Sequence, residues 1–317
     1  MRIVKPPKLR KGSVLGVVSP SSTITQVLDD YTTGIESLRG FGFEIKEGLT
    51  TTVREGLMPG SDEERAGDIN AMFADSDVDG IMCALGGRYG LRTLRHLDWD
   101  LIGSNPKVFS GMSDITTFHA AFLAKTGLSG LHQSDVAFGF GQDPGSPGWK
   151  FETSLFLRIA GDSRPLGSLP SLTPWACWRG GRAEGRLFGG HLPTLRNLIG
   201  TKYFPEIDEK IIFFFEAIGE YFDEVEKILV QFREAGILDK TDGMLVGKIR
   251  GEKDGKVIDM TANLREVVAE ITDEYDIPVI AGMDFGHYTP NLPLPLGIKA
   301  EMNADLLNVR IIESYVK

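Results

Sequence analysis

The first half of the chain alternates short apolar runs with stretches in which apolar residues recur every three to four positions. Residues 13–19 form an apolar run that predicts a buried strand, and residues 27–40 then show helical spacing. The alternation continues through apolar runs at 80–85 and 107–110, each followed by a helical pattern. Repeated strand and helix signals of this kind are typical of parallel β/α units.

The pattern stops at residues 161–180, which read GDSRPLGSLPSLTPWACWRG. This stretch is rich in Gly, Pro and Ser and shows neither strand nor helix periodicity, so it predicts a linker. We therefore expect an N-terminal domain at 1–160 and a C-terminal domain at 181–317. The latter mixes strands, helices and closing β runs and is not regularly wound.

Length and charge narrow the possible functions. A chain of 317 residues suits two domains, and a net charge of −10 gives no basic surface for a nucleic acid polymer or an anionic membrane. The apolar run at 14–18 is too short for a signal peptide, and no segment reaches membrane-spanning length. We expect a cytoplasmic protein with a small-molecule partner, in which Cys83 and Cys177 are buried, reduced thiols.

Ser113 stands where the strand ending in VFSGM turns into a helical pattern. Serine before a helix is a preferred N-cap, and Asp114 would suit the positive end of the helix dipole. A strand-turn-helix junction can also expose a nucleophilic serine, with free helix N–H groups beside it to stabilise an oxyanion. The motif G-x-S-x-G is incomplete here, so the residues alone leave both interpretations open.

A nucleophilic serine needs a base, and the chain has five histidines. His96 and His119 fall inside helix patterns and suit packing or surface roles, whereas His132 and His191 lie near turns and stay ambiguous. His287 ends a strand and leads into the proline-rich loop YTPNLPLPLG, which could fix its side chain or simply expose it.

Glu216 follows three consecutive phenylalanines in KIIFFFEA. A carboxylate at the end of so apolar a strand either reaches water or finds a partner such as an imidazole. The chain has no HExxH motif and no paired cysteines, and its histidines are too scattered in sequence for a recognisable ligand set, so we expect no metal and no cofactor. The glycines of GGRYG do not match a nucleotide-binding loop but could bring a backbone N–H close to a substrate.

Five blocks of the chain, in order, resemble the serine LD-carboxypeptidases, peptidase family S66. That family contains the muramoyltetrapeptide carboxypeptidases of murein recycling and the microcin C immunity peptidases. The blocks cover nearly the whole chain and read ALGGRYGLRTLRHLDWDLI, NPKVFSGMSDIT, GRAEGRLFGGHLPTLRNLIGT, IIFFFEAIGE and DFGHYTPNLPLPLG.

The resemblance implies a Ser-Glu-His triad of Ser113, Glu216 and His287, with an oxyanion hole from the backbone N–H groups of Gly87 and Asp114. It also implies an α/β fold: an N-terminal doubly wound parallel sheet of the flavodoxin or glutamine-amidotransferase type and a smaller, β-rich C-terminal α/β domain. Members of the family usually form homodimers.

The chain departs from the family at one block, where His191 stands in GGHL and the family commonly reads GGNL. A short loop before the second domain fits the murein enzymes, whereas DFGHYTP resembles the microcin branch.

The function predicted from the resemblance is release of the terminal D-amino acid from a murein tetrapeptide by hydrolysis of an L-D amide bond. Hydrolysis of a peptidyl- or aminoacyl-adenylate is the alternative, and a non-catalytic peptide-binding protein on the same scaffold is an alternative of another class. A substrate carboxylate would need a cation or backbone donors. Arg88, beside Gly87, is one candidate cation, or it is a plain surface arginine.

Overall fold

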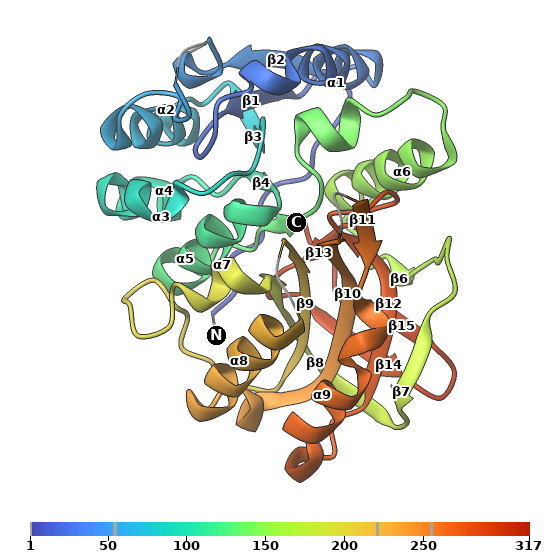
Figure 1. Ribbon diagram of the computed structural model, residues 1–317. Coiled ribbons are helices and arrows are strands. Elements are labelled where there is room, and N and C mark those ends of the chain that lie inside the picture. The colour runs from blue at the N-terminus through green and yellow to red at the C-terminus, as the bar shows by residue number, and fades with distance from the viewer. Residues whose placement is uncertain (1, 53–55, 220–221, 254–255) are drawn as a thin grey trace.

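The computed structural model describes residues 2–52, 56–219, 222–253 and 256–317, which form two β-sheets flanked by helices (Figure 1). The first sheet has the strand order β13-β5-β4-β3-β1-β2. Its strands are β1 (Val14–Val18), β2 (Glu44–Glu47), β3 (Val78–Cys83), β4 (Val108–Gly111), β5 (Leu131–His132) and β13 (Leu294–Pro295). Strands β1 to β5 are parallel, whereas β13 comes from the far end of the chain and pairs antiparallel with β5.

Helices cover both faces of this first sheet. One side carries α2 (Asp62–Ala74), α3 (Gly90–Thr93), α4 (Trp99–Ser104) and α5 (Thr116–Thr126), and the other carries α1 (Leu28–Gly40) and α6 (Pro147–Gly161) (Figure 1). Ser61 and Glu64 close the capping box that begins α2. This arrangement is the expected doubly wound parallel sheet, and its order reverses between β1 and β3 as in flavodoxin-like folds.

The second sheet is larger and mixed, with the order β6-β15-β14-β8-β9-β10-β12-β7 and β11 paired to β10. Its strands are β6 (Gly167–Ser168), β7 (Ala176–Arg179), β8 (Arg182–His191), β9 (Ile211–Ile218), β10 (Thr241–Lys253), β11 (Lys256–Asp259), β12 (Val279–Gly286), β14 (Lys299–Asn303) and β15 (Asn308–Ile311). The helices of this region are α7 (Leu192–Arg196), α8 (Phe222–Glu234) and α9 (Arg265–Ile271). The central strands β8, β9, β10 and β12 are parallel. The β-rich C-terminal region predicted from the family resemblance is thus present.

Residues 161–180, expected as a linker, contribute strands to both edges of the second sheet. Strand β6 pairs with β15 and β7 pairs with β12. The buried Asp284 carboxylate holds the intervening segment by accepting hydrogen bonds from the backbone N–H of Leu172 and the indole N–H of Trp175. Strands of two and four residues are too short to show periodicity, which is why the sequence pattern did not indicate them. The domain boundaries remain a prediction.

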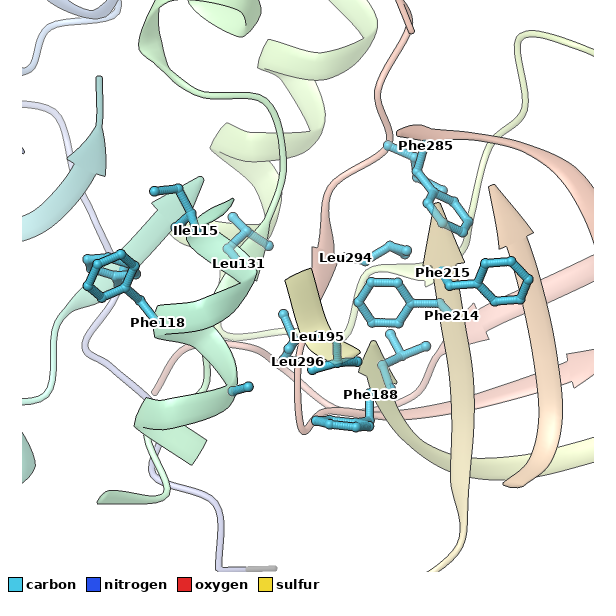
Figure 2. Close-up of a cluster of buried hydrophobic side chains, with 14 of the residues drawn as sticks. Ile115, Phe118, Leu131, Phe188, Leu195, Phe214, Phe215, Phe285, Leu294 and Leu296 are labelled. Carbon is cyan, nitrogen blue, oxygen red and sulfur yellow. The ribbon is translucent and has the colours of Figure 1, made fainter. Parts of the chain in front are cut away.

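The space between the two sheets is filled by apolar side chains, as Figure 2 shows. Phe214 points toward Leu195 and Leu294 in this space, whereas the neighbouring Phe215 points the opposite way (Figure 2). Both faces of β9 are covered, so Phe213, Phe214 and Phe215 are all buried without polar alternation. The shared core holds the carboxyl end of β9 in place beside the first sheet.

The two cysteines differ in their exposure to solvent. Cys83 is buried, but the expectation that Cys177 is buried was wrong, because it lies on the short edge strand β7 and is exposed. Among the residues that the structure describes, no helix combines the length and apolar character required to cross a bilayer.

Candidate active site

Ser113 occupies a strained turn between β4 and α5. Its φ angle is +62°, in the left-handed region that a serine adopts at a cost of about 1–3 kcal/mol. A short 3-10 helix over 113–115 leads into α5, and neither helix start is capped by a side chain. The N-cap interpretation of Ser113 is therefore wrong for its hydroxyl, and the geometry resembles a nucleophile turn.

Asp114 ties this turn to the loops that follow two neighbouring strands. Its buried carboxylate accepts hydrogen bonds from the Ser21 hydroxyl, after β1, and from the Gly90 backbone N–H, after β3. The side chain of Asp114 thus orients the carboxyl edge of the sheet, and its role is larger than the helix-dipole contribution expected from the sequence.

Glu216 and His287 form a hydrogen-bonded pair beside this edge. His287 Nδ1 lies 2.7 Å from Glu216 Oε2, and the Glu216 side chain has no solvent exposure. Burial tends to raise the pKa of Glu216, but the electrostatic interactions with His287 and His191 and the hydrogen bond from His287 outweigh burial and lower that pKa below its ordinary value. The carboxylate is therefore ionised near neutral pH and can orient the imidazole through Nδ1–H.

Strand alternation and one glycine leave room for these two side chains to meet once the sheet is assembled. Alternation along β9 places Glu216 on the same face as Phe214, toward the first sheet. Gly286 precedes His287 with φ +122°, and a Cβ at Gly286 would lie 3.0 Å from the Glu216 Cβ. Glycine therefore permits both the backbone conformation and the close approach of β12 to Glu216.

Ser113 and His287 line one cavity of about 750 Å³, bounded mainly by residues that follow β3, β4, β5 and β12. The cavity lies outside the carboxyl edge of the first sheet, where ligands bind in open α/β sheets. Glu216 lies behind His287 and is not among the lining residues. No hydrogen bond joins Ser113 and His287 within the described part of the chain. Hydrogen bonds between a nucleophile and its base are often long in the absence of substrate and shorten when substrate binds.

The glycine loop after β3 packs against Ser113, since a Cβ at Gly86 would lie 2.8 Å from the Ser113 Cβ. Gly87 has φ +144°, and a Cβ there would lie 2.1 Å from the Ser22 hydroxyl oxygen. The backbone N–H groups of Gly86, Tyr89 and Gly90 already donate to side chains of other loops. The N–H groups of Gly87 and Asp114 have no such acceptor among the described residues and are available to a substrate oxygen.

The remaining sequence-based candidates lie as follows. Arg88 is exposed and is not among the cavity-lining residues, whereas Arg250 lines the cavity and donates from Nη1 to the carbonyl oxygen of His287. His119 is buried, with Nε2 bonded to the Gly111 carbonyl, and His96 pairs with Glu63 near the surface.

His132 and His191 are both buried beside Glu216. Burial lowers the pKa of His132 to about 3 and that of His191 to about 4, so both are neutral at physiological pH. The histidines are too scattered in the sequence to indicate a ligand set, yet donor atoms of His191, Glu216 and His287 all lie within 4.8 Å of one another.

A second polar cluster, which the sequence analysis did not single out, supports the His287 loop. The Asn291 side chain accepts from the Gly286 N–H and donates to the Ser134 hydroxyl, while its backbone N–H donates to the buried Glu152. Asp135, which follows β5, accepts from the Gly86 N–H and orients the glycine loop. The polar run QSD directly after β5 was the available signal for this cluster.

Both halves of the chain match domains of one known protein family. Residues 15–133 match the family described as the LD-carboxypeptidase N-terminal domain, and residues 184–302 match the LD-carboxypeptidase C-terminal domain. The chain is 31% identical over 306 residues to the "Probable murein peptide carboxypeptidase" of Bacillus subtilis, covering 94% of this chain and 91% of the relative. It is 28% identical over 338 residues to the Microcin C7 self-immunity protein MccF of Escherichia coli, covering 97% and 95%.

Solved structures of both kinds of relative share the fold. Microcin C7 self-immunity protein MccF in complex with aspartyl sulfamoyl adenosine superposes with a TM-score of 0.89 at 29% identity, covering 99% of this chain and 100% of that one. Muramoyltetrapeptide carboxypeptidase from Oxalobacter formigenes superposes with a TM-score of 0.79 at 25% identity, covering 96% and 100%.

Proposed function

The chain belongs to the LD-carboxypeptidase family, and from this premise we propose that it is a serine carboxypeptidase that releases the terminal D-amino acid of a murein tetrapeptide. The observation that carries the proposal is the hydrogen-bonded Glu216–His287 pair, which meets the strained Ser113 turn at one cavity. Carboxypeptidase activity at family level is supported by the names of the relatives, and the substrate and the triad are our inference.

The proposed reaction follows the serine-triad pattern. Ser113 Oγ attacks the carbonyl of the L-D amide bond while His287 Nε2 takes the hydroxyl proton, and Glu216 stabilises the imidazolium through Nδ1–H. The N–H groups of Gly87 and Asp114 hold the oxyanion. His287 then protonates the leaving D-amino acid amine, and a water molecule, deprotonated by His287, hydrolyses the acyl-enzyme.

Hydrolysis of a peptidyl- or aminoacyl-adenylate is the second candidate function. It is favoured by the higher TM-score to the MccF complex that contains aspartyl sulfamoyl adenosine. The two candidates use the same triad and differ only in the leaving group and its contacts. Arg250 supplies a cation at the cavity for a substrate carboxylate or phosphate, and Arg88 would have to turn from its exposed position to do so.

The experiment that tests the proposal compares Ser113→Ala with Ser110→Ala. The Ser110 hydroxyl is buried on β4, the strand that leads into the Ser113 turn, and has no hydrogen-bond partner in the described residues, so its removal is a matched control. We expect Ser113→Ala to reduce D-alanine release from a murein tetrapeptide by roughly a million-fold, the scale of serine-triad knockouts. Near-normal release by Ser113→Ala would refute the triad, and a faster reaction with a peptidyl-adenylate would favour the second candidate.

We further infer that the enzyme is cytoplasmic, where murein fragments are recycled, and that it works as a homodimer, as its family resemblance implies. Light scattering after gel filtration would measure the mass of the assembly against the chain mass of 34.8 kDa. A mass of one chain across the working concentration range would contradict the dimer.

A further inference from the structure

His191 lies next to the proposed triad because β8 ends beside β9. The register of these parallel strands pairs His191 with Glu216. The His191 and His287 rings are 5.2 Å apart between centroids. One ring nitrogen from each histidine and one oxygen of Glu216 therefore fall within 4.8 Å of one another, although the three residues are widely separated in sequence.

Among the described residues, one polar atom of His191 and one of Glu216 have no hydrogen-bond partner. His191 Nδ1 is bonded to the Thr194 hydroxyl at 2.8 Å, and its Nε2 is buried with no partner in the described ranges. Glu216 Oε1 is equally buried and, over the same residues, equally unpartnered. The exposed fractions of His191 and Glu216 are 9% and 0%, so solvent does not supply a hydrogen-bond partner for either atom. A buried polar atom left without a partner destabilises the fold, and a bound cation would satisfy it.

We propose that His191, Glu216 and His287 form a site for a divalent transition-metal ion, best filled by Zn²⁺, and that the bound ion inhibits the enzyme. Two imidazole nitrogens and one carboxylate oxygen are a donor set that zinc accepts, with a further position left open. Calcium and magnesium favour sites built from oxygen donors alone, so neither should compete well.

The geometry requires only side-chain adjustment. Tetrahedral zinc with ligand bonds near 2.0–2.1 Å separates its donor atoms by about 3.4 Å. The donor atoms here lie within 4.8 Å of one another, and His287 Nδ1 lies 2.7 Å from Glu216 Oε2. His287 lines the cavity, so an ion could enter from there.

The ion would act by competing with the contact on which catalysis depends. A metal that engages Glu216 and His287 replaces the hydrogen bond between them and occupies the imidazole that must accept the Ser113 proton. The inhibition therefore rests on the proposed function, whereas metal binding itself does not. His191 is the residue that distinguishes this site from the triad, because the proposed reaction does not use it.

The test measures Zn²⁺ binding to the chelator-stripped full chain by calorimetry, with Mg²⁺ as the comparison ion. We expect one Zn²⁺ per chain for wild type and unchanged affinity for Ser113→Ala, which retains all three ligands. His191→Asn should bind roughly tenfold or more weakly, whereas His96→Asn, a surface control, should bind like wild type. Thermal unfolding of each variant, together with the visible absorption of bound Co²⁺, would separate loss of the site from loss of the fold.

A second experiment measures tetrapeptide hydrolysis with and without Zn²⁺. Zn²⁺ should inhibit wild type and His96→Asn, and adding chelator should restore their activity. It should inhibit His191→Asn far less, relative to the metal-free rate of that variant. Equal Zn²⁺ affinity of folded His191→Asn and wild type, or no stoichiometric binding to wild type, would overturn the proposal. One-site binding together with a complete absence of hydrolysis would sustain the metal site and refute the proposed function instead.

Discussion

Replacing Glu216 by Gln tests whether the buried carboxylate supports catalysis through charge. Gln keeps the size of the side chain and can still accept from His287 Nδ1–H, but it removes the negative charge 2.7 Å from the imidazole. Coulomb's law at an effective dielectric constant of about 20, with charge centres roughly 3–4 Å apart, gives about 4–6 kcal/mol of stabilisation for the imidazolium. At 1.36 kcal/mol per tenfold change in rate, we expect kcat to fall roughly 10³–10⁴-fold.

The assay is D-alanine release from a murein tetrapeptide, with thermal unfolding measured in parallel. Glu209→Gln is the matched control, because Glu209 is a part-exposed carboxylate that accepts from Arg186 at 2.8 Å in the same region of the fold. It should change kcat less than about twofold, because Glu209 precedes the amino end of β9 and does not line the cavity. A folded Glu216→Gln variant whose kcat stays within tenfold of wild type would refute the reasoning that Glu216 stabilises a charged His287.

Three further predictions follow from the site. Gly87→Ala places a Cβ against the Ser22 hydroxyl at a φ of +144°, so the loop must move. We expect kcat to fall roughly 10²–10³-fold, as for loss of one oxyanion donor. An unchanged kcat would exclude Gly87 from the oxyanion hole. Burial raises the pKa of Glu152 from an ordinary 4.5 to about 8, so the folded chain keeps a proton that the unfolded chain releases. Urea titrations should therefore show the free energy of unfolding falling from pH 5 to 8. If Glu152→Gln leaves this dependence of the unfolding free energy on pH unchanged, Glu152 is not its origin. Arg250→Ala should raise KM at least tenfold if its cation holds a substrate carboxylate, and a larger effect of Arg88→Ala would restore the sequence-based choice.

Much of the architecture is encoded in local patterns. The alternation of apolar runs and helical spacing was sufficient for the parallel α/β sheet, because strand and helix periods are set by neighbouring residues. The Ser113 turn and the Phe-rich strand that carries Glu216 were visible for the same reason. The short edge strands β6, β7 and β13 were not, because two to four residues do not define a period.

What only the tertiary structure decided is which of these residues meet. Glu216 and His287 are 71 residues apart, and their hydrogen bond depends on strand order and on the clearance that Gly286 provides. Asp114, a plausible helix-dipole residue in the sequence, turned out to join two loops, and His191 was brought beside Glu216 by the register of β8 on β9. Local periodicity decides which face of an element a side chain occupies. The partner that it meets there is decided by long-range packing between two sheets, and no local pattern carries that information.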